Sequence, residues 1–211
     1  MTSEGSDRYL SFTKDEDTRM GILNKAIVYS RMIKLEHTIF ALPFALSAVV
    51  LAARETPVTA SMLFWIVMAM VGARSAAMGF NRIVDARLDA KNPRTAIREI
   101  PKGVISVQQA GVFVLLSSAL FMLSAAMLSE LCLWLSVPVL LILFSYSYAK
   151  RFTWLAHIIL GFAIGMAPLG VWVAINGAVS WKIGILSLAL LTYIAGFDIL
   201  YACQDLEFDR R

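Results

Sequence analysis

Two short acidic runs carry the side chains best suited to binding a metal or a charged ligand. The first places Asn81, Asp85 and Asp89 at intervals of four residues, where a long apolar run meets polar sequence. That interval keeps side chains on one face of a helix, so the three residues are predicted to form one polar stripe. Stacked carboxylates repel one another unless a cation fills the space between them. Oxygen ligands of this kind favour Mg²⁺ that carries a phosphorylated substrate.

The second acidic run lies at the end of another apolar stretch, near residue 197. Its polar members are Asp198, Tyr201, Asp205 and Asp209. On a continuous helix these residues would also share one face. The sequence therefore predicts two acidic stripes, each at the end of a long apolar helix.

Basic residues follow the first acidic run within a short loop. Arg94 and Arg98 come soon after Asp89, and Lys150 and Arg151 end a later apolar run. Cations beside carboxylates are expected where a polyphosphate is bound, because Mg²⁺ takes carboxylate and phosphate oxygens while arginine clamps the remaining phosphate oxygens. The combination predicts a site for a magnesium diphosphate.

The composition indicates an integral membrane protein, because 59% of the 211 residues are hydrophobic and only 16% are charged. About 20 apolar residues are needed to cross the hydrocarbon layer. Apolar runs of suitable length occupy residues 37–53, 60–80, 103–129, 131–149, 152–181 and 183–197. We therefore predict an all-α polytopic transmembrane bundle with six spans. Residues 1–20 are predicted to be a disordered tail and residues 21–36 an amphipathic helix in the membrane interface.

The basic residues also predict the orientation in the membrane. All but three of the 19 lie before the first predicted span or after the second, fourth and sixth. The exceptions are Arg54, Arg74 and Lys182. By the positive-inside rule the N-terminus and both acidic runs face the cytoplasm, at the cytoplasmic (inner) membrane of the cell. Because these basic residues are spread over several short loops, topology explains them better than nucleic-acid binding does.

The two acidic runs resemble the paired aspartate motifs of the UbiA superfamily of intramembrane prenyltransferases. The first motif continues into Arg94-Thr95 and Arg98, and the second follows in the expected order near the end of the last run. The similarity extends from about Arg31 to Arg211, includes residues 148–151 and Arg74, and is greatest to the 4-hydroxybenzoate polyprenyltransferase branch.

This resemblance implies a helical bundle that opens laterally to lipid and uses Mg²⁺ to bind the diphosphate of a polyprenyl donor. The allylic carbon–oxygen bond would ionise, and the ring of an aromatic acid would attack the resulting cation. The implied activity is prenylation of 4-hydroxybenzoate in ubiquinone or menaquinone biosynthesis. The implied partners are the two substrates and the lipid bilayer.

The resemblance also implies roles for individual residues. The implied metal ligands are Asn81, Asp85, Asp89, Asp198, Asp205 and Asp209. The implied catalytic residues are Asp85, Asp89, Asp205 and Tyr201. The implied substrate-binding residues are Arg74, Arg94, Arg98, Lys150 and Arg151. Of these, Arg74 lies about 10 Å below Asn81 along the same predicted helix and would reach the carboxylate of the aromatic acid.

The sequence departs from the family pattern in two respects. Arg82 stands where the family commonly has aspartate, which removes one carboxylate from the first motif. The family pattern has nine membrane helices, so we expect residues 21–211 to form a domain that lacks its C-terminal part or completes its bundle with a partner.

Several alternatives remain open from the sequence. The same chemistry could act on a dihydroxynaphthoate, a tetrapyrrole or a glycerol phosphate ether. A transporter is an alternative of another class, because charged residues inside membrane segments also mark transport pathways. Arg74 has an equally good interpretation as a residue that reaches the membrane surface or pairs with a neighbour, and His157 is expected to be a satisfied interfacial or packed histidine. Gly161, Gly165 and Gly170 are expected to let helices approach closely.

Overall fold

The computed structural model describes residues 27–33, 42–153 and 155–205, and in these ranges every regular element is a helix. Residues 27–32 form a helical segment. The helices that follow are α2 (Leu42–Ala52), α3 (Ala60–Asp89), α4 (Val107–Leu128), α5 (Glu130–Ala149), α6 (Ala156–Asn176), α7 (Trp181–Ala202) and the 3₁₀ turn η2 (Cys203–Asp205). The predicted all-α class is confirmed.

Serine and threonine side chains begin three of the long helices. Thr59 accepts a hydrogen bond from the Met62 amide at the start of α3. Ser106 and Gln109 form a reciprocal capping box at the start of α4. Ser129 alone separates α4 from α5, and its hydroxyl accepts from the Cys132 amide at 3.1 Å. Each hydroxyl satisfies a backbone amide that has no partner within its own helix, so the helix boundaries follow from local sequence.

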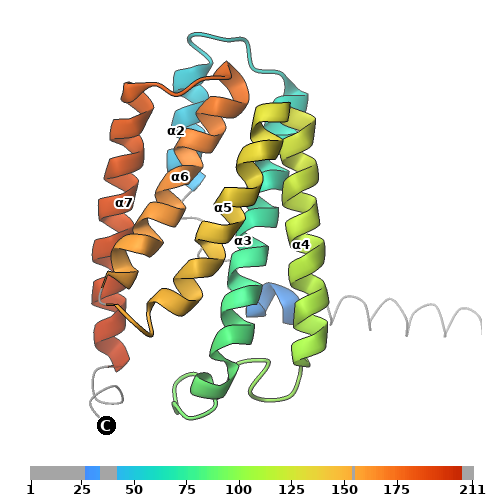
Figure 1. The fold of residues 1–211 in the computed structure, drawn as a ribbon, viewed down its shortest axis with the longest axis vertical. Helices are drawn as coiled ribbons and strands as arrows, with labels where there is room; N and C mark the ends of the chain where they lie inside the picture. Colours follow the sequence, from blue (N-terminus) through green and yellow to red (C-terminus); the bar gives the residue numbers. More distant parts are fainter. Residues whose placement is uncertain (1–26, 34–41, 154, 206–211) are drawn as a thin grey trace, which may run out of the picture.

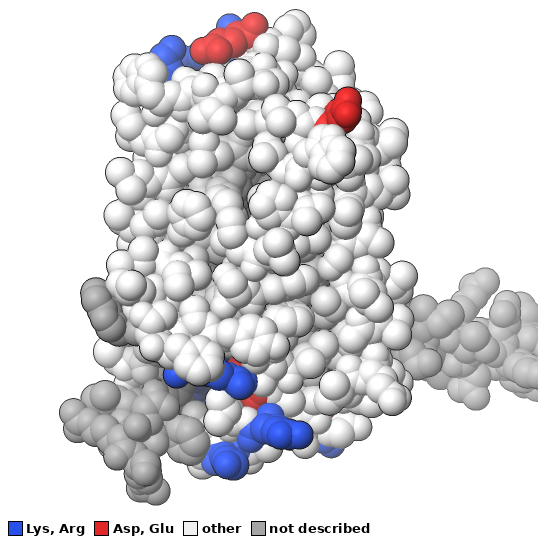
Figure 2. All heavy atoms as spheres, in the orientation of Figure 1, with Lys and Arg blue, Asp and Glu red and all other residues white. Residues whose placement is uncertain are grey.

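Five of the described helices, α3 to α7, are long and apolar enough to cross a membrane. The first predicted span appears as α2, for which 11 residues are described. Large apolar side chains face outward, and Leu115 on α4 and Leu200 on α7 are 70% and 73% exposed. Figure 2 shows acidic and basic residues mainly at the two ends of the molecule, with a wide uncharged band between them. Outward apolar surface of this kind suits contact with lipid.

The long helices run up and down in an antiparallel bundle (Figure 1). Since α3, α5 and α7 run in one direction, their C-terminal ends lie together with the start of α6 at one end of the bundle. We call this the motif end, because it contains Asp89, Lys150 and Tyr201. The other end contains the turns that precede α3 and α7.

Glycines allow the closest approaches between helices. A Cβ atom on Gly72 of α3 would lie 2.7 Å from the backbone nitrogen of Phe121 on α4. Gly161 and Gly165, one turn apart on α6, face backbone oxygens of α7, and a Cβ on Gly165 would lie 3.0 Å from the Ser187 oxygen. Small residues four apart are a common way for membrane helices to pack. A Cβ on Gly170 would meet no atom within 4 Å, so our expectation of close packing there was wrong.

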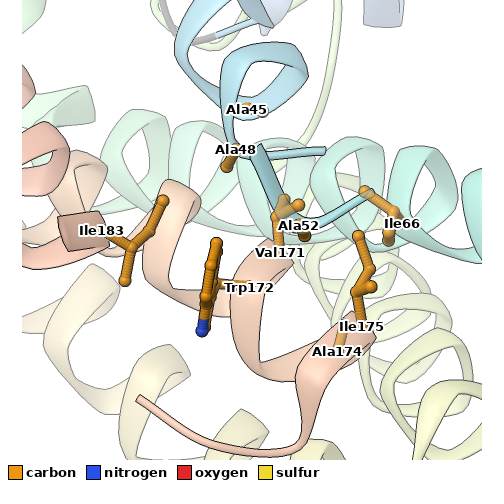
Figure 3. Packing of buried hydrophobic residues seen from close by; sticks show 9 residues of the cluster. All are labelled: Ala45, Ala48, Ala52, Ile66, Val171, Trp172, Ala174, Ile175 and Ile183. Carbon is orange, nitrogen blue, oxygen red and sulfur yellow. The ribbon is translucent and has the colours of Figure 1, made fainter. Parts of the chain in front are cut away.

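A hydrophobic core closes the bundle at the end opposite the motif end (Figure 3). Short residues of α2, including Ala48, let Trp172 of α6 and Ile183 of α7 pack nearby. At the motif end, a second cluster holds the helical segment 27–32 against α4, where Tyr29 stacks on Phe113 with ring centroids 5.0 Å apart.

Candidate active site

A cavity of about 1050 Å³ lies among α3, α4, α5, α6 and α7. Its lining is charged where α3, α5 and α7 end and mainly apolar along their middle parts, where Arg74 of α3 is the charged residue among the described ones. Ile66, Val171 and Ala174 belong both to this lining and to the hydrophobic core of Figure 3. The cavity is therefore a long apolar pocket with a charged mouth at the motif end.

The first acidic stripe lies on one continuous helix, because α3 extends to Asp89 as predicted. Asp85 and Asp89 are only 5% and 7% exposed. The amide of Asn81 lies 3.4 Å from the Ser147 hydroxyl on α5. With this amide turned by 180°, Asn81 donates to Asp85 Oδ2 at 3.2 Å and accepts from Lys150 Nζ at 3.1 Å, which satisfies both neighbours. Asn81, Asp85 and Asp89 line the cavity mouth.

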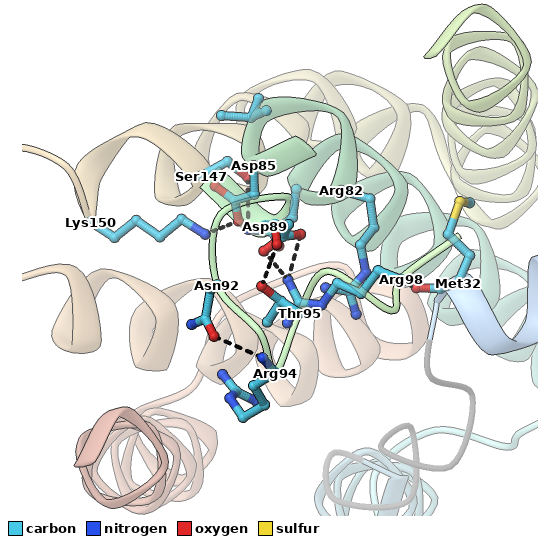
Figure 4. Close-up of polar contacts among 12 residues, drawn as sticks. Met32, Arg82, Asp85, Asp89, Asn92, Arg94, Thr95, Arg98, Ser147 and Lys150 are labelled. Carbon is cyan, nitrogen blue, oxygen red and sulfur yellow. Dashed lines mark hydrogen bonds and ion pairs between the residues drawn. The ribbon is translucent and has the colours of Figure 1, made fainter. Parts of the chain in front are cut away.

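Basic residues neutralise both carboxylates of this stripe (Figure 4). Lys150 pairs with Oδ2 of Asp85, and a guanidinium nitrogen of Arg151 lies 3.7 Å from Oδ1. Arg98 places one nitrogen 2.6 Å from both oxygens of Asp89. Buried carboxylates need such partners, because burial of an isolated charge is costly.

The loop after α3 connects the two acidic runs. The Arg94 amide donates to Asn92 Oδ1 at 2.9 Å, and the Thr95 hydroxyl donates to the Asp89 carbonyl at 3.0 Å. This turn points the Arg94 side chain toward α7, where its guanidinium donates to the Tyr201 hydroxyl at 3.3 Å and lies 5.4 Å from the ring centroid. A residue that follows the first run thus contacts a residue of the second.

The second acidic run departs from the continuous helix that we predicted. Asp198 and Tyr201 lie on α7 and line the cavity. The helix ends at Ala202, and the backbone of Asp205 lies in the 3₁₀ turn η2. A 3₁₀ turn has about 3.0 residues per turn instead of 3.6, so the helical repeat changes after Ala202. Asp209 lies outside the described residues.

Arg82 points away from the carboxylate that binds Lys150. It is 5% exposed, and its Nε donates at 3.1 Å to the carbonyl of Met32 at the end of segment 27–32 (Figure 4). A cation is favourable at the C-terminal end of a helix because the last carbonyls carry partial negative charge. Arg82 thus anchors the N-terminal segment to α3.

Every described residue that we predicted for substrate binding lines the same cavity. These residues are Arg74, Arg94, Arg98, Lys150 and Arg151. Arg74 is half-buried on α3, deeper in the bundle than the other four. Its position on the wall is compatible with contact to a ligand inside the pocket.

The sequence alone did not indicate two polar residues of the cavity mouth, Tyr146 and His157, or the buried Ser147 of α5. Tyr146 lies one helical turn before Lys150, and the Lys150 Nζ is 5.8 Å from the centroid of the Tyr146 ring. The spacing of four residues could therefore have indicated that Tyr146 shares a helix face with Lys150. Ser147 was found only through its contact with Asn81. His157, which we expected to be a satisfied interfacial or packed histidine, is hydrogen-bonded, because its Nδ1 lies 2.8 Å from Asp198 Oδ2.

The residues of the mouth fit Mg²⁺ bound together with a phosphate. In the described part of the chain, no three His, Cys, Asp or Glu side chains gather closely enough to hold a metal on their own. Mg²⁺ commonly uses only one or two carboxylates and takes its other ligands from substrate phosphates and water. Asp85 Oδ1 is buried and accepts no hydrogen bond from the described residues, so one carboxylate oxygen is available as a ligand.

The fold and the cavity define a class of protein: a polytopic helical membrane protein whose buried apolar pocket opens at a mouth of paired carboxylates and cations. A family model described as the UbiA prenyltransferase family matches residues 41–211. The chain belongs to the UbiA prenyltransferase family, and it is an integral membrane protein.

Curated relatives and solved structures agree with this assignment. The chain is 28% identical over 189 residues to a 4-hydroxybenzoate octaprenyltransferase of Vibrio campbellii and 30% identical over 189 residues to one of Vibrio cholerae. In both comparisons the match covers 88% of this chain and 66% of the relative. The chain therefore spans slightly less than two thirds of the length of these relatives.

Two solved structures have the same fold. The apo structure of a UbiA homolog from Aeropyrum pernix K1 superposes with a TM-score of 0.76 at 37% identity, covering 83% of this chain and 66% of that one. A UbiA homolog from Archaeoglobus fulgidus bound to GPP and Mg²⁺ gives a TM-score of 0.69 at 21% identity, covering 87% of this chain and 65% of that one.

Proposed function

We propose that this protein transfers a polyprenyl group from a polyprenyl diphosphate to the ring of an aromatic acid, with Mg²⁺ as cofactor and 4-hydroxybenzoate as the acceptor. The observation that carries the proposal is the charged mouth on an apolar cavity, where carboxylates and cations from α3, α5 and α7 lie together. The names of the Vibrio relatives and the diphosphate-bound Archaeoglobus structure support the same assignment.

In the structure, the carboxylates and cations of the mouth neutralise one another, and donor binding would separate them. Asp85 and Asp89 would hold Mg²⁺ together with Asn81, while Lys150 and Arg98 would turn to the phosphate oxygens. Each charged group would then exchange one ionic partner for another, so no buried charge is left alone. Asp198, Asp205 and Asp209 would supply the second set of oxygen ligands.

The chemistry begins with cleavage of the bond between the allylic carbon and the diphosphate oxygen, and the electron pair stays on that oxygen. When bound, Mg²⁺ stabilises the negative charge of the leaving group. Arg94 and Arg98 would bind the same charge, with Tyr201 holding the Arg94 side chain in place. A ring carbon beside the acceptor hydroxyl then forms a bond to the allylic cation. Transfer of the proton from that carbon to the released diphosphate would restore the aromatic ring.

The apolar part of the cavity would have two tasks in this reaction. It would hold the prenyl chain along α4 and α5, and it would keep water from the allylic cation. Arg74, on the wall below the charged mouth, would bind the carboxylate of the aromatic acid. We assign the motif end to the cytoplasmic side of the inner membrane, because the loops at that end carry most of the basic residues.

An assay with labelled polyprenyl diphosphate, Mg²⁺ and a panel of acceptors tests the proposal. We expect prenylated product with 4-hydroxybenzoate and loss of product in Asp85→Asn. If product formed only with a dihydroxynaphthoate, a tetrapyrrole or a glycerol phosphate ether, the proposed reaction would stand but that compound would be the acceptor. Solute flux in proteoliposomes without any prenylated product would favour a transporter and contradict the proposal.

A further inference from the structure

Three helices meet at a single oxygen atom of Asp198. His157 at the start of α6 places Nδ1 2.8 Å from Oδ2 of Asp198, which lies on α7. Tyr146 on α5 donates its hydroxyl to the same oxygen at 3.4 Å. All three side chains line the mouth of the cavity. The second oxygen of this carboxylate, Oδ1, takes part in neither contact.

The direction of these hydrogen bonds follows from the chemistry of the groups. Carboxylate oxygens accept, so the proton of the shorter contact lies on Nδ1 of His157, and the phenol of Tyr146 donates as well. A carboxylate held at one oxygen by two donors has little freedom to rotate about its Cβ–Cγ bond. Oδ1 of Asp198 is therefore held in a defined position.

The contact is not needed to hold α6 and α7 together. Gly161 and Gly165 already bring these helices into close backbone contact further along the bundle. His157 keeps 31% of its side chain exposed, and the Asp198 side chain is 20% exposed. A polar bond at the cavity mouth, with both partners open to the pocket, is better placed to orient a ligand-binding group than to stabilise packing.

The Tyr146 ring extends the arrangement to the first acidic run, because it also lies 5.8 Å from Nζ of Lys150. Lys150 is the partner of Asp85. The side chains from His157 to Asp85 thus form a continuous series of polar contacts across the mouth.

We propose that His157 is a positioning residue for Asp198: it holds Oδ2 so that Oδ1 is presented to the magnesium diphosphate. This inference rests on the proposed function. Carboxylates that bind metals are themselves commonly hydrogen-bonded, and loss of such a partner typically lowers metal affinity or activity about 10- to 100-fold.

Three substitutions of the same residue separate this role from a packing role. The side-chain amide nitrogen introduced by His157→Asn is separated from Cβ by the same number of bonds as Nδ1 of histidine. This variant can therefore keep the hydrogen bond. The nitrogen of His157→Gln lies one bond further away and matches Nε2. His157→Phe keeps a ring but has no nitrogen. Thr192→Val serves as a control, because Thr192 bonds only to carbonyls of its own helix in the described structure.

The experiment measures binding of Mn²⁺, as a spectroscopic substitute for Mg²⁺, to the purified full chain with inorganic diphosphate, by electron paramagnetic resonance. We expect His157→Phe and His157→Gln to bind about 10- to 100-fold more weakly than the unaltered chain, and His157→Asn to stay within a few-fold of it. In the prenyl transfer assay, the Mg²⁺ concentration for half-maximal rate should rise in the same order. Thermal unfolding in detergent should be nearly unchanged in all four variants.

Equal Mn²⁺ affinity in His157→Phe and the unaltered chain would overturn the positioning role and leave the proposed function intact. Equal losses in His157→Asn and His157→Phe would also overturn it, because the hydrogen bond through Nδ1 would then be irrelevant. If the unaltered chain bound no Mn²⁺ with diphosphate, the proposed function would fail, and this inference with it.

Discussion

Arg94 donates a hydrogen bond at 3.3 Å to the hydroxyl of Tyr201, and the guanidinium also lies 5.4 Å from the Tyr201 ring centroid. The two residues are 107 positions apart in the sequence. This contact joins the loop after the first acidic run to the helix that carries the second.

Tyr201→Phe should weaken donor binding modestly. The substitution keeps the ring beside Arg94 and removes one hydrogen bond, which is worth about 0.5–1.5 kcal/mol. We expect the KM for polyprenyl diphosphate to rise by roughly twofold to tenfold with a smaller change in kcat. Arg94→Ala, which loses both contacts and the charge, should have the larger effect. If Tyr201→Phe bound the donor more weakly than Arg94→Ala, the Tyr201 hydroxyl would act through a group other than Arg94.

Arg74→Met should affect the acceptor more than the donor. Methionine keeps much of the length of the side chain but has no charge to bind a carboxylate. We expect the KM for 4-hydroxybenzoate to rise at least about tenfold, because a charge-assisted pair inside the cavity is lost. The KM for polyprenyl diphosphate should stay within about twofold. Steady-state kinetics with each substrate varied in turn measure the two KM values separately. Equal increases in both KM values would refute an acceptor role for Arg74.

A larger side chain at Cys132 should shorten the prenyl chain that the cavity accepts. Cys132 on α5 lines the apolar part of the cavity and packs against the core of Figure 3. Cys132→Phe would fill that space, so competition assays with short and long donors should shift toward the short ones. Leu141→Phe is a control on the same helix, because Leu141 is 64% exposed. An unchanged preference in Cys132→Phe would mean that the chain follows another path.

Gly165→Val should destabilise the bundle. The new side chain would meet the Ser187 carbonyl and Leu191 of α7, and overpacking of this kind typically costs about 1–3 kcal/mol. Gly184→Val is the matched control, because no atom lies within 4 Å of a Cβ at Gly184. Unfolding of both variants in detergent should show a loss of stability only at Gly165. Equal stability of the two variants would contradict close packing of α6 on α7.

Much of the fold could be predicted from local sequence patterns. Apolar run lengths predicted the helices, and intervals of four placed Asn81, Asp85 and Asp89 on one face of a helix that the structure confirms. These patterns work because each depends on residues within a few turns of one another.

Contacts between helices could not be predicted from such local patterns. The partner of His157 is 41 positions away, and the partner of Arg82 is 50 positions away. Nothing near either residue in the sequence indicates its partner. The end of α7 at Ala202 was also missed, because intervals of four residues continue to Asp209 after the α-helix itself has ended.

Binding of the donor provides the decisive test that both acidic runs serve one site. Equilibrium binding of a labelled, slowly reacting prenyl thiodiphosphate should be measured with and without Mg²⁺ in the unaltered chain, Asp85→Asn and Asp205→Asn. Lys182→Ala is the control, because this exposed lysine pairs with Glu55 at the opposite end. We predict Mg²⁺-dependent binding that each aspartate substitution weakens at least about tenfold and Lys182→Ala leaves unchanged. Unaltered affinity in Asp205→Asn, with binding lost in Asp85→Asn, would contradict a site shared by the two runs.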